Sequence, residues 1–150
     1  MKKIMSAWDG SETAAQAFEK AAELAAESGA ELHVVSVADV PDYADTVGEY
    51  EGAIEDAARF FGRKRERLQA AARRHGVGYE AEVIRGHPAN ALIEHAREGR
   101  FDLLVVGRKG HGALERFLLG SVTLKLAAHA PCPLLIVPKA APEAAPEKRP

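Results

Sequence analysis

The chain has 150 residues, of which 47% are hydrophobic and 28% charged, and its formal net charge at pH 7 is −2. This composition is typical of one globular domain and excludes a wholly disordered chain. The lone Cys132 excludes a disulfide scaffold and favours a reducing, cytoplasmic location. No apolar run approaches the roughly 20 residues of a membrane-spanning helix. The small net charge argues against general attraction to nucleic acid or anionic membrane.

Short apolar runs alternate along the chain with segments of helical period. Strands are expected at 4–8, 32–38, 77–85, 101–106 and 134–137, and helices at about 13–28, 50–75, 89–97 and 121–129. Thr13 and Gln16 form a capping-box pattern at the start of the first helix, and Gly29 suits a left-handed residue after its end. Five strands separated by helices predict a parallel sheet that is covered on both faces.

Two segments of the chain have a distinctive charge pattern. In the third strand Glu80 and Glu82 alternate with apolar residues, which predicts one wet face, as at a sheet edge. A basic run lies between Arg59 and Arg74, but the same expected helix begins with acids and no aromatic residue interleaves the bases. We interpret this run as a solvated face that complements the helix dipole, not as a nucleic-acid site. Residues 140–150 lack an apolar period, so a domain over 1–139 with a disordered tail is expected.

Glycines and hydroxyl residues follow the fourth strand. Gly107 and Gly110 are followed, after nine residues, by Gly120 and Ser121 at the start of the last expected helix. A helix N-terminus offers unpaired N–H groups to an anion, and Arg108 would add positive charge. The spacing matches neither a Walker loop nor the dinucleotide fingerprint. The glycines taken alone would serve equally well as turn residues.

With this G-x2-G-x9-G-S motif the chain resembles the universal stress protein family. The resemblance covers Lys3 to Pro138 and includes the strand exit 9–12, the turn 86–88 and the ending 131–138. It implies an α/β fold, a single-domain, doubly wound, five-stranded parallel sheet of order 3-2-1-4-5, like the adenine-nucleotide alpha-hydrolases. In such a sheet the first and fourth strands are neighbours, and ligands bind at their carboxyl ends.

The resemblance also implies a site for ATP, or for AMP or ADP, with Mg²⁺ as a candidate companion. The expected binding residues are Ala7, Asp9, Val37, Val106, Gly107, Arg108, Gly110, Gly120, Ser121, Val122 and Thr123. Main chain at Val37 would hold adenine, and the positions from Gly107 to Thr123 would hold ribose and phosphates. Asp9 has two other interpretations, as a cap of the following helix or as a neighbour of a divalent cation. Trp8 would either line the pocket or narrow it.

No catalytic residue or metal ligand is assigned from the sequence. The six histidines form no His-x3-His or Cys/His cluster, so a structural zinc site is not expected, although His111 could approach phosphate. The phosphate cradle without an evident base or nucleophile favours an ATP-binding regulator or sensor of the stress response. A slow ATPase or nucleotidyl-transferring enzyme, or a nucleotide-independent module that recruits a partner protein, are the alternatives. The family resemblance and the apolar last strand, Leu134–Val137, predict a homodimer through this sheet edge.

Overall fold

A computed structural model describes residues 1–39, 47–62, 65–108 and 119–139. The elements follow in the order β1 (Lys3–Ala7), α1 (Glu12–Ser28), β2 (Glu31–Ala38), α2 (Val47–Gly62), α3 (Arg65–His75), β3 (Glu80–Arg85), α4 (Pro88–Glu98), β4 (Leu103–Gly107), α6 (Ser121–His129) and β5 (Leu134–Val137). The five strands form one parallel sheet of order β3-β2-β1-β4-β5. The predicted fold class and strand order are therefore confirmed. The expected tail, 140–150, lies outside the described residues.

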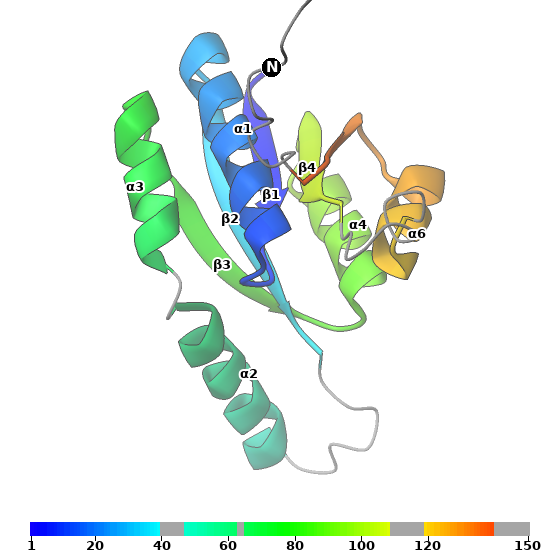
Figure 1. Cartoon of the computed structure of the whole chain (residues 1–150). Coiled ribbons are helices and arrows are strands. Elements are labelled where there is room, and N and C mark those ends of the chain that lie inside the picture. Colours follow the sequence, from blue (N-terminus) through cyan, green and yellow to red (C-terminus); the bar gives the residue numbers. More distant parts are fainter. Residues whose placement is uncertain (40–46, 63–64, 109–118, 140–150) are drawn as a thin grey trace, which may run out of the picture.

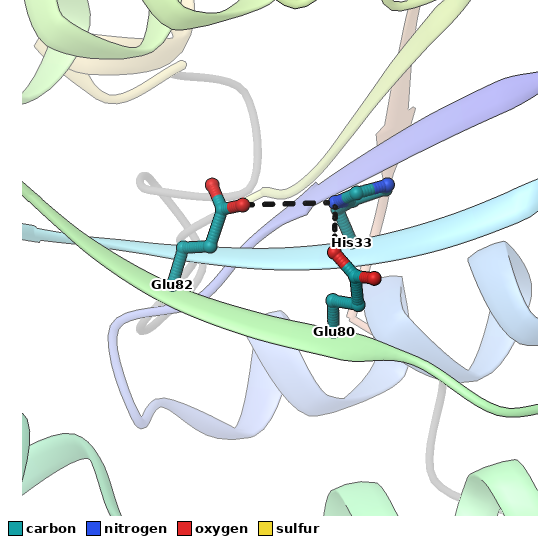
Figure 2. A group of neighbouring side chains, drawn as sticks. All are labelled: His33, Glu80 and Glu82. Atoms are coloured by element: carbon teal, nitrogen blue, oxygen red, sulfur yellow. Dashed lines mark ion pairs between the residues drawn. The ribbon is translucent and has the colours of Figure 1, made fainter.

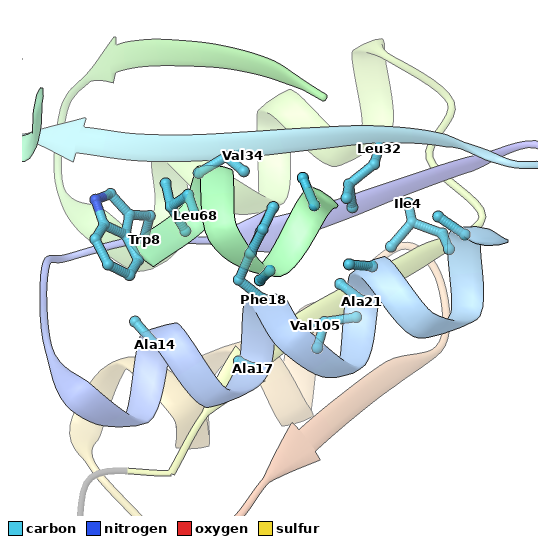
Figure 3. Packing of buried hydrophobic residues seen from close by; sticks show 14 of the residues in the cluster. Ile4, Trp8, Ala14, Ala17, Phe18, Ala21, Leu32, Val34, Leu68 and Val105 are labelled. Atoms are coloured by element: carbon cyan, nitrogen blue, oxygen red, sulfur yellow. The ribbon is translucent and has the colours of Figure 1, made fainter. Parts of the chain in front are cut away.

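The sheet lies between two layers of helices, with α1 and α3 on one face and α4 and α6 on the other (Figure 1). Successive residues of the central strands alternate between these layers, so that Ile4 packs beneath α1 whereas Met5 packs beneath α4 and α6. Figure 3 shows Phe18 of α1 and Leu68 of α3 packed beside the strands. Burial on both faces explains the continuous apolar run of β4.

The expected helix over 50–75 is wrong, because α2 and α3 are separate helices that pack against different partners. α2 contacts β2 and β3, whereas α3 packs along α1 and buries Leu68, Ala71 and Ala72. Gly62, a poor helix former, ends α2. The elements that each helix packs against, and not the helical period of the sequence, determine where α2 ends and α3 begins.

The basic run contributes ion pairs between α3 and α1. Arg67 pairs with Glu12, and Arg74 pairs with Glu19, which also lies 2.7 Å from Nε2 of His75. These contacts lower the pKa of both carboxyl groups, chiefly through the arginine hydrogen bonds. Part of the basic run is thus paired with the acids of a neighbouring helix. Within the described parts of the chain, no helix is both long and apolar enough to cross a bilayer.

Candidate functional site

A cavity of about 270 Å³ opens at the carboxyl ends of β1 and β4. These strands are neighbours, and α1 leaves β1 toward one face of the sheet while α6 lies on the opposite face. This is the switch point at which doubly wound sheets bind ligands, and the volume lies just below the roughly 300–1,000 Å³ of ordinary ligand pockets. The described lining residues are Ala7, Trp8, Asp9, Ser11, Thr13, Ala14, Val35, Val37, Pro88, Leu92, Val106, Gly107, Gly120, Ser121, Val122, Thr123 and Leu126.

The predicted binding residues, apart from Arg108 and Gly110, all line this cavity. Gly110 lies outside the described residues. Arg108 is not among the described lining residues; its main-chain N–H donates to the Val137 carbonyl at 2.8 Å and extends the β4–β5 ladder. Its Nε is buried and has no hydrogen-bond partner among the residues that the structure describes.

The N-terminus of α1 is capped by side chains of its own loop. Gly10 has a φ of 80°, and Oδ1 of Asp9 accepts the Ser11 N–H at 2.9 Å. Ser11 is the N-cap, and its Oγ accepts the Ala14 N–H at 3.2 Å. The expected capping box at Thr13 was wrong by two residues, because the turn at Asp9 and Gly10 brings Ser11 to the cap position. Asp9 supports this cap and also lines the cavity.

The N-terminus of α6 is open by comparison. Its N-cap, Gly120, has φ −61° and ψ 158° and provides no side-chain hydrogen bond. The Leu124 N–H donates to the Gly120 carbonyl at 2.9 Å and so begins the helical ladder. The preceding N–H groups, of Ser121 to Thr123, have no acceptor within the helix. The first turn of α6 contains no acidic residue, so its dipole and amides favour an anion in the cavity.

The two described glycines of the motif have different structural roles. A Cβ on Gly107 would lie 2.4 Å from the carbonyl oxygen of Thr13, so this glycine permits α1 to approach β4 closely. A Cβ on Gly120 would meet no atom within 4 Å. Neither glycine has a positive φ. Gly107 is therefore required for packing between α1 and β4, whereas Gly120 keeps the mouth of α6 free of a side chain.

Trp8 lines the cavity and is also part of the core beneath α1 and α3. Only 4% of its surface is exposed, and its main-chain N–H donates to the Val35 carbonyl at 2.9 Å. Val35 was not predicted as a lining residue, but it pairs with Ala7 in the β1–β2 register. The other unpredicted lining residues come from the first turn of α1, from Pro88 and Leu92 of α4 and from Leu126 of α6. These residues could not be predicted from the sequence pattern, because only tertiary packing brings them to the cavity. α4 and α6 cover the same end of the sheet.

Comparison with known proteins gives a consistent result. A family model described as the universal stress protein family matches residues 1–138. A universal stress protein of Thermus aquaticus is 37% identical over 139 residues, covering 91% of this chain and 98% of its own. Another, from Methanocaldococcus jannaschii, is 34% identical over 141 residues, covering 92% of this chain and 82% of its own. A solved universal stress protein in complex with cAMP aligns with a TM-score of 0.73 and 26% identity, over 93% of this chain and 98% of that one. The chain belongs to the universal stress protein family.

Proposed function

We propose that this protein binds an adenine nucleotide, ATP foremost, in the cavity at β1 and β4, and acts as a nucleotide-dependent regulator of the stress response in the cytoplasm. The observation that carries the proposal is the open N-terminus of α6, where a glycine cap leaves amides facing the cavity. A relative of the same fold is solved with cAMP, an adenine nucleotide with one phosphate. The G-x2-G-x9-G-S motif, whose positions are expected to bind ribose and phosphates, favours ATP, which has a longer phosphate chain than cAMP.

Main chain of Val37 is well placed to bind adenine. In β2 the Val35 carbonyl accepts from Trp8, toward β1, and the Ala38 carbonyl accepts from Gly86, toward β3. Because main-chain groups alternate between the two sides of a strand, the N–H and carbonyl of Val37 point toward the β1 side. The β1 strand ends at Ala7, the partner of Val35, so Val37 lies beyond its end and beside the cavity. An adenine edge carries the complementary donor and acceptor.

Asp9 determines which form of nucleotide the site prefers. It is the single charged residue among the described lining residues, and its carboxylate would repel a polyphosphate. Mg²⁺ is held in proteins by few carboxylates together with phosphate oxygens, and such an ion beside Asp9 would turn repulsion into attraction. We therefore expect ATP binding to strengthen with Mg²⁺ and AMP binding to depend on it less.

Calorimetric titration of the full chain with ATP, and with AMP for comparison, tests this proposal. Gly120→Val places a side chain at the N-terminus of α6, where a Cβ meets no atom within 4 Å, and is expected to weaken ATP binding at least about 100-fold, because the side chain keeps the phosphates away from the amides of Ser121 to Thr123. Gly78→Val is the matched control, since a Cβ there also meets nothing within 4 Å and the residue is far from the cavity wall. Binding can be followed by fluorescence, because Trp8 is the chain's one tryptophan.

Saturable ATP binding by the wild type and the Gly78 variant, lost in the Gly120 variant with its circular dichroism unchanged, would support the proposal. No binding to the wild type at millimolar ATP, or equal affinity in both variants, would contradict it.

We further propose that the active form is a homodimer through β5. This strand is the last in the sheet, and all four of its apolar residues, Leu134 to Val137, are half-buried in the single chain. An apolar edge with unpaired main chain favours pairing with a second copy about a two-fold axis. Sedimentation at micromolar concentration is expected to give the mass of two chains, and a monomeric mass would count against this assembly.

A further inference from the structure

A second group of chemically active side chains lies on the α4 and α6 face of the sheet, where β2 pairs with β3. The parallel register places His33 opposite Glu80 and Val35 opposite Glu82, so His33 and both glutamates share one face. Figure 2 shows the two carboxylates directed at the same edge of the imidazole. Nδ1 of His33 lies 3.6 Å from Oε2 of Glu80 and 3.9 Å from Oε1 of Glu82.

The imidazole at the centre of this group is buried and only half satisfied. His33 is 7% exposed, and its Nε2 lies 3.3 Å from Oε2 of Glu31. Its Nδ1 has no hydrogen-bond partner in the described parts of the chain. A buried polar atom without a partner is destabilising, and native proteins contain few of them. The two carboxylates face this nitrogen but do not reach it.

The spacing of these atoms suits an ion between them. Distances of 3.6 and 3.9 Å exceed the ordinary hydrogen-bond range of about 2.7–3.2 Å. Two ligands of a tetrahedral Zn²⁺ with bonds of about 2.0–2.2 Å are separated by roughly 3.3–3.6 Å. All three ligand atoms lie within 4.8 Å of one another, so a small closing movement of Glu82 completes the arrangement.

The surroundings hold the candidate ligands in place. Nε2 of His95, on α4, lies 2.7 Å from Oε2 of Glu82, the carboxylate oxygen that does not face His33. This contact orients the carboxylate. The Phe101 ring meets His33 edge-on at 5.1 Å and fixes the imidazole plane. Nζ of Lys3 lies 4.6 Å from the centre of the Phe101 ring and donates to the Gly99 carbonyl at 2.9 Å. Three carboxylates, counting Glu31, thus surround one imidazole, and the excess negative charge favours a cation.

We propose that His33, Glu80 and Glu82 form a site for a divalent transition-metal ion of the Zn²⁺ type. Imidazole with carboxylate is a donor set that Zn²⁺ accepts, whereas Mg²⁺ and Ca²⁺ prefer oxygen alone. The Glu80 side chain is 75% exposed, so an ion can enter from solvent and keep water in its remaining position. The site is separate from the cavity, since none of its three side chains is among the residues that line the cavity. A bound ion would tie the edge strand β3 to β2.

Calorimetric titration of the chelator-treated full chain with Zn²⁺ alone tests the site. We expect one saturable event, weakened at least about 10-fold in the double variant Glu80→Gln and Glu82→Gln. These substitutions preserve shape and lie on exposed or half-exposed positions, so the fold should persist. The double variant Glu23→Gln and Glu27→Gln, on α1, removes the same charge away from His33 and should bind as the wild type does. Absence of a saturable event in the wild type, or equal affinity in the Glu80 and Glu82 variant, would overturn the proposal.

Imidazole ¹⁵N spectra of the wild type identify the ligand without any substitution. Zn²⁺ is expected to shift Nδ1 of His33 in proportion to the occupancy measured by calorimetry. A shift confined to other histidines, such as His75 or His129, would assign the binding to another site and would likewise overturn the proposal.

Discussion

The N-termini of α1 and α6 face the same cavity but are satisfied in opposite ways. At α1 the Ser11 hydroxyl caps the helix, Asp9 accepts the Ser11 N–H, and Glu12 adds negative charge to the first turn. At α6 the cap is Gly120, with no side-chain hydrogen bond and no acid in the first turn. The first helix is thus complete without a ligand, whereas the second leaves its amides to one. The comparison separates a helix end that supports the fold from one that is available for binding.

The largest loss of stability is expected at the contact between the first turn of α1 and β4. Gly107→Ala would place a Cβ 2.4 Å from the Thr13 carbonyl oxygen, and this backbone cannot move without displacing the helix. Overpacking typically costs roughly 1–3 kcal/mol, and we expect about 3 kcal/mol less free energy of unfolding by urea denaturation. Gly120→Ala, with open space around its Cβ, should lose less than about 1 kcal/mol. Similar losses in the two variants would show that Gly107 is not a packing residue.

Ser11→Ala removes the cap of α1 and leaves the Ala14 N–H without its acceptor. Loss of an N-cap hydroxyl costs about 1 kcal/mol, so the urea midpoint should fall. ATP affinity should change much less than in Gly120→Val. The comparison between the two helix ends would fail if Ser11→Ala weakened ATP binding and left stability unchanged.

Gly120→Ser makes α6 resemble α1 by adding a hydroxyl at its N-cap. A serine cap exceeds glycine by only a few tenths of a kcal/mol, so a small rise in melting temperature is expected. The same hydroxyl would occupy an amide that we assign to phosphate, and ATP affinity should fall. A variant that gained both stability and affinity would show that the amides of α6 are not the phosphate donors.

A further small effect on stability concerns the charge at the first turn of α1. The hydrogen bond from Arg67 lowers the pKa of Glu12, so the ionised form stabilises the fold above the unfolded pKa of about 4.3. This contribution is lost as pH falls through the lower, folded value. Because Glu12 is half-exposed, it amounts to no more than about 1 kcal/mol. Glu12→Gln should therefore be less stable than the wild type at pH 7 and equal to it near pH 2, by urea denaturation at each pH. If the difference in stability between Glu12→Gln and the wild type persisted or increased in acid, the ion pair with Arg67 would not be its cause.

The strands were predictable from local features, whereas the strand order and the predicted part of the cavity wall rested on the family resemblance. Apolar runs gave the strands, and the family resemblance of the glycine motif gave the order that joins Asp9 to Gly107. Contacts between distant segments were not predictable from the sequence. The close approach of Thr13 to Gly107 gives that glycine a packing role, and Arg108, expected in the site, is not among the described lining residues. The division between α2 and α3 likewise follows from what each helix packs against.

The His33 group illustrates the same limit. Within short segments of the sequence, none of the histidines has the spacing of a metal-ligand motif such as His-x3-His. The register of β2 and β3 brings His33 beside Glu80, far along the chain, and only the paired strands show it. The edge position expected for β3 is confirmed by the strand order, but the expected wet face is not, because Ala81 is exposed like Glu80 and Glu82 is half-buried like Val83. The two glutamates share a partner in another strand, His33.

We infer that main-chain amides of α6, and not those of α1, hold the phosphates of a nucleotide. Amide chemical shifts of the full chain, recorded with ATP and with adenosine, test this inference most directly. The N–H signals of Ser121, Val122 and Thr123 are expected to shift strongly with ATP and little with adenosine, while that of Ala14, already bonded to Ser11, should change little with either. Equal shifts with both ligands, or phosphate-dependent shifts at Ala14 instead of at α6, would contradict it.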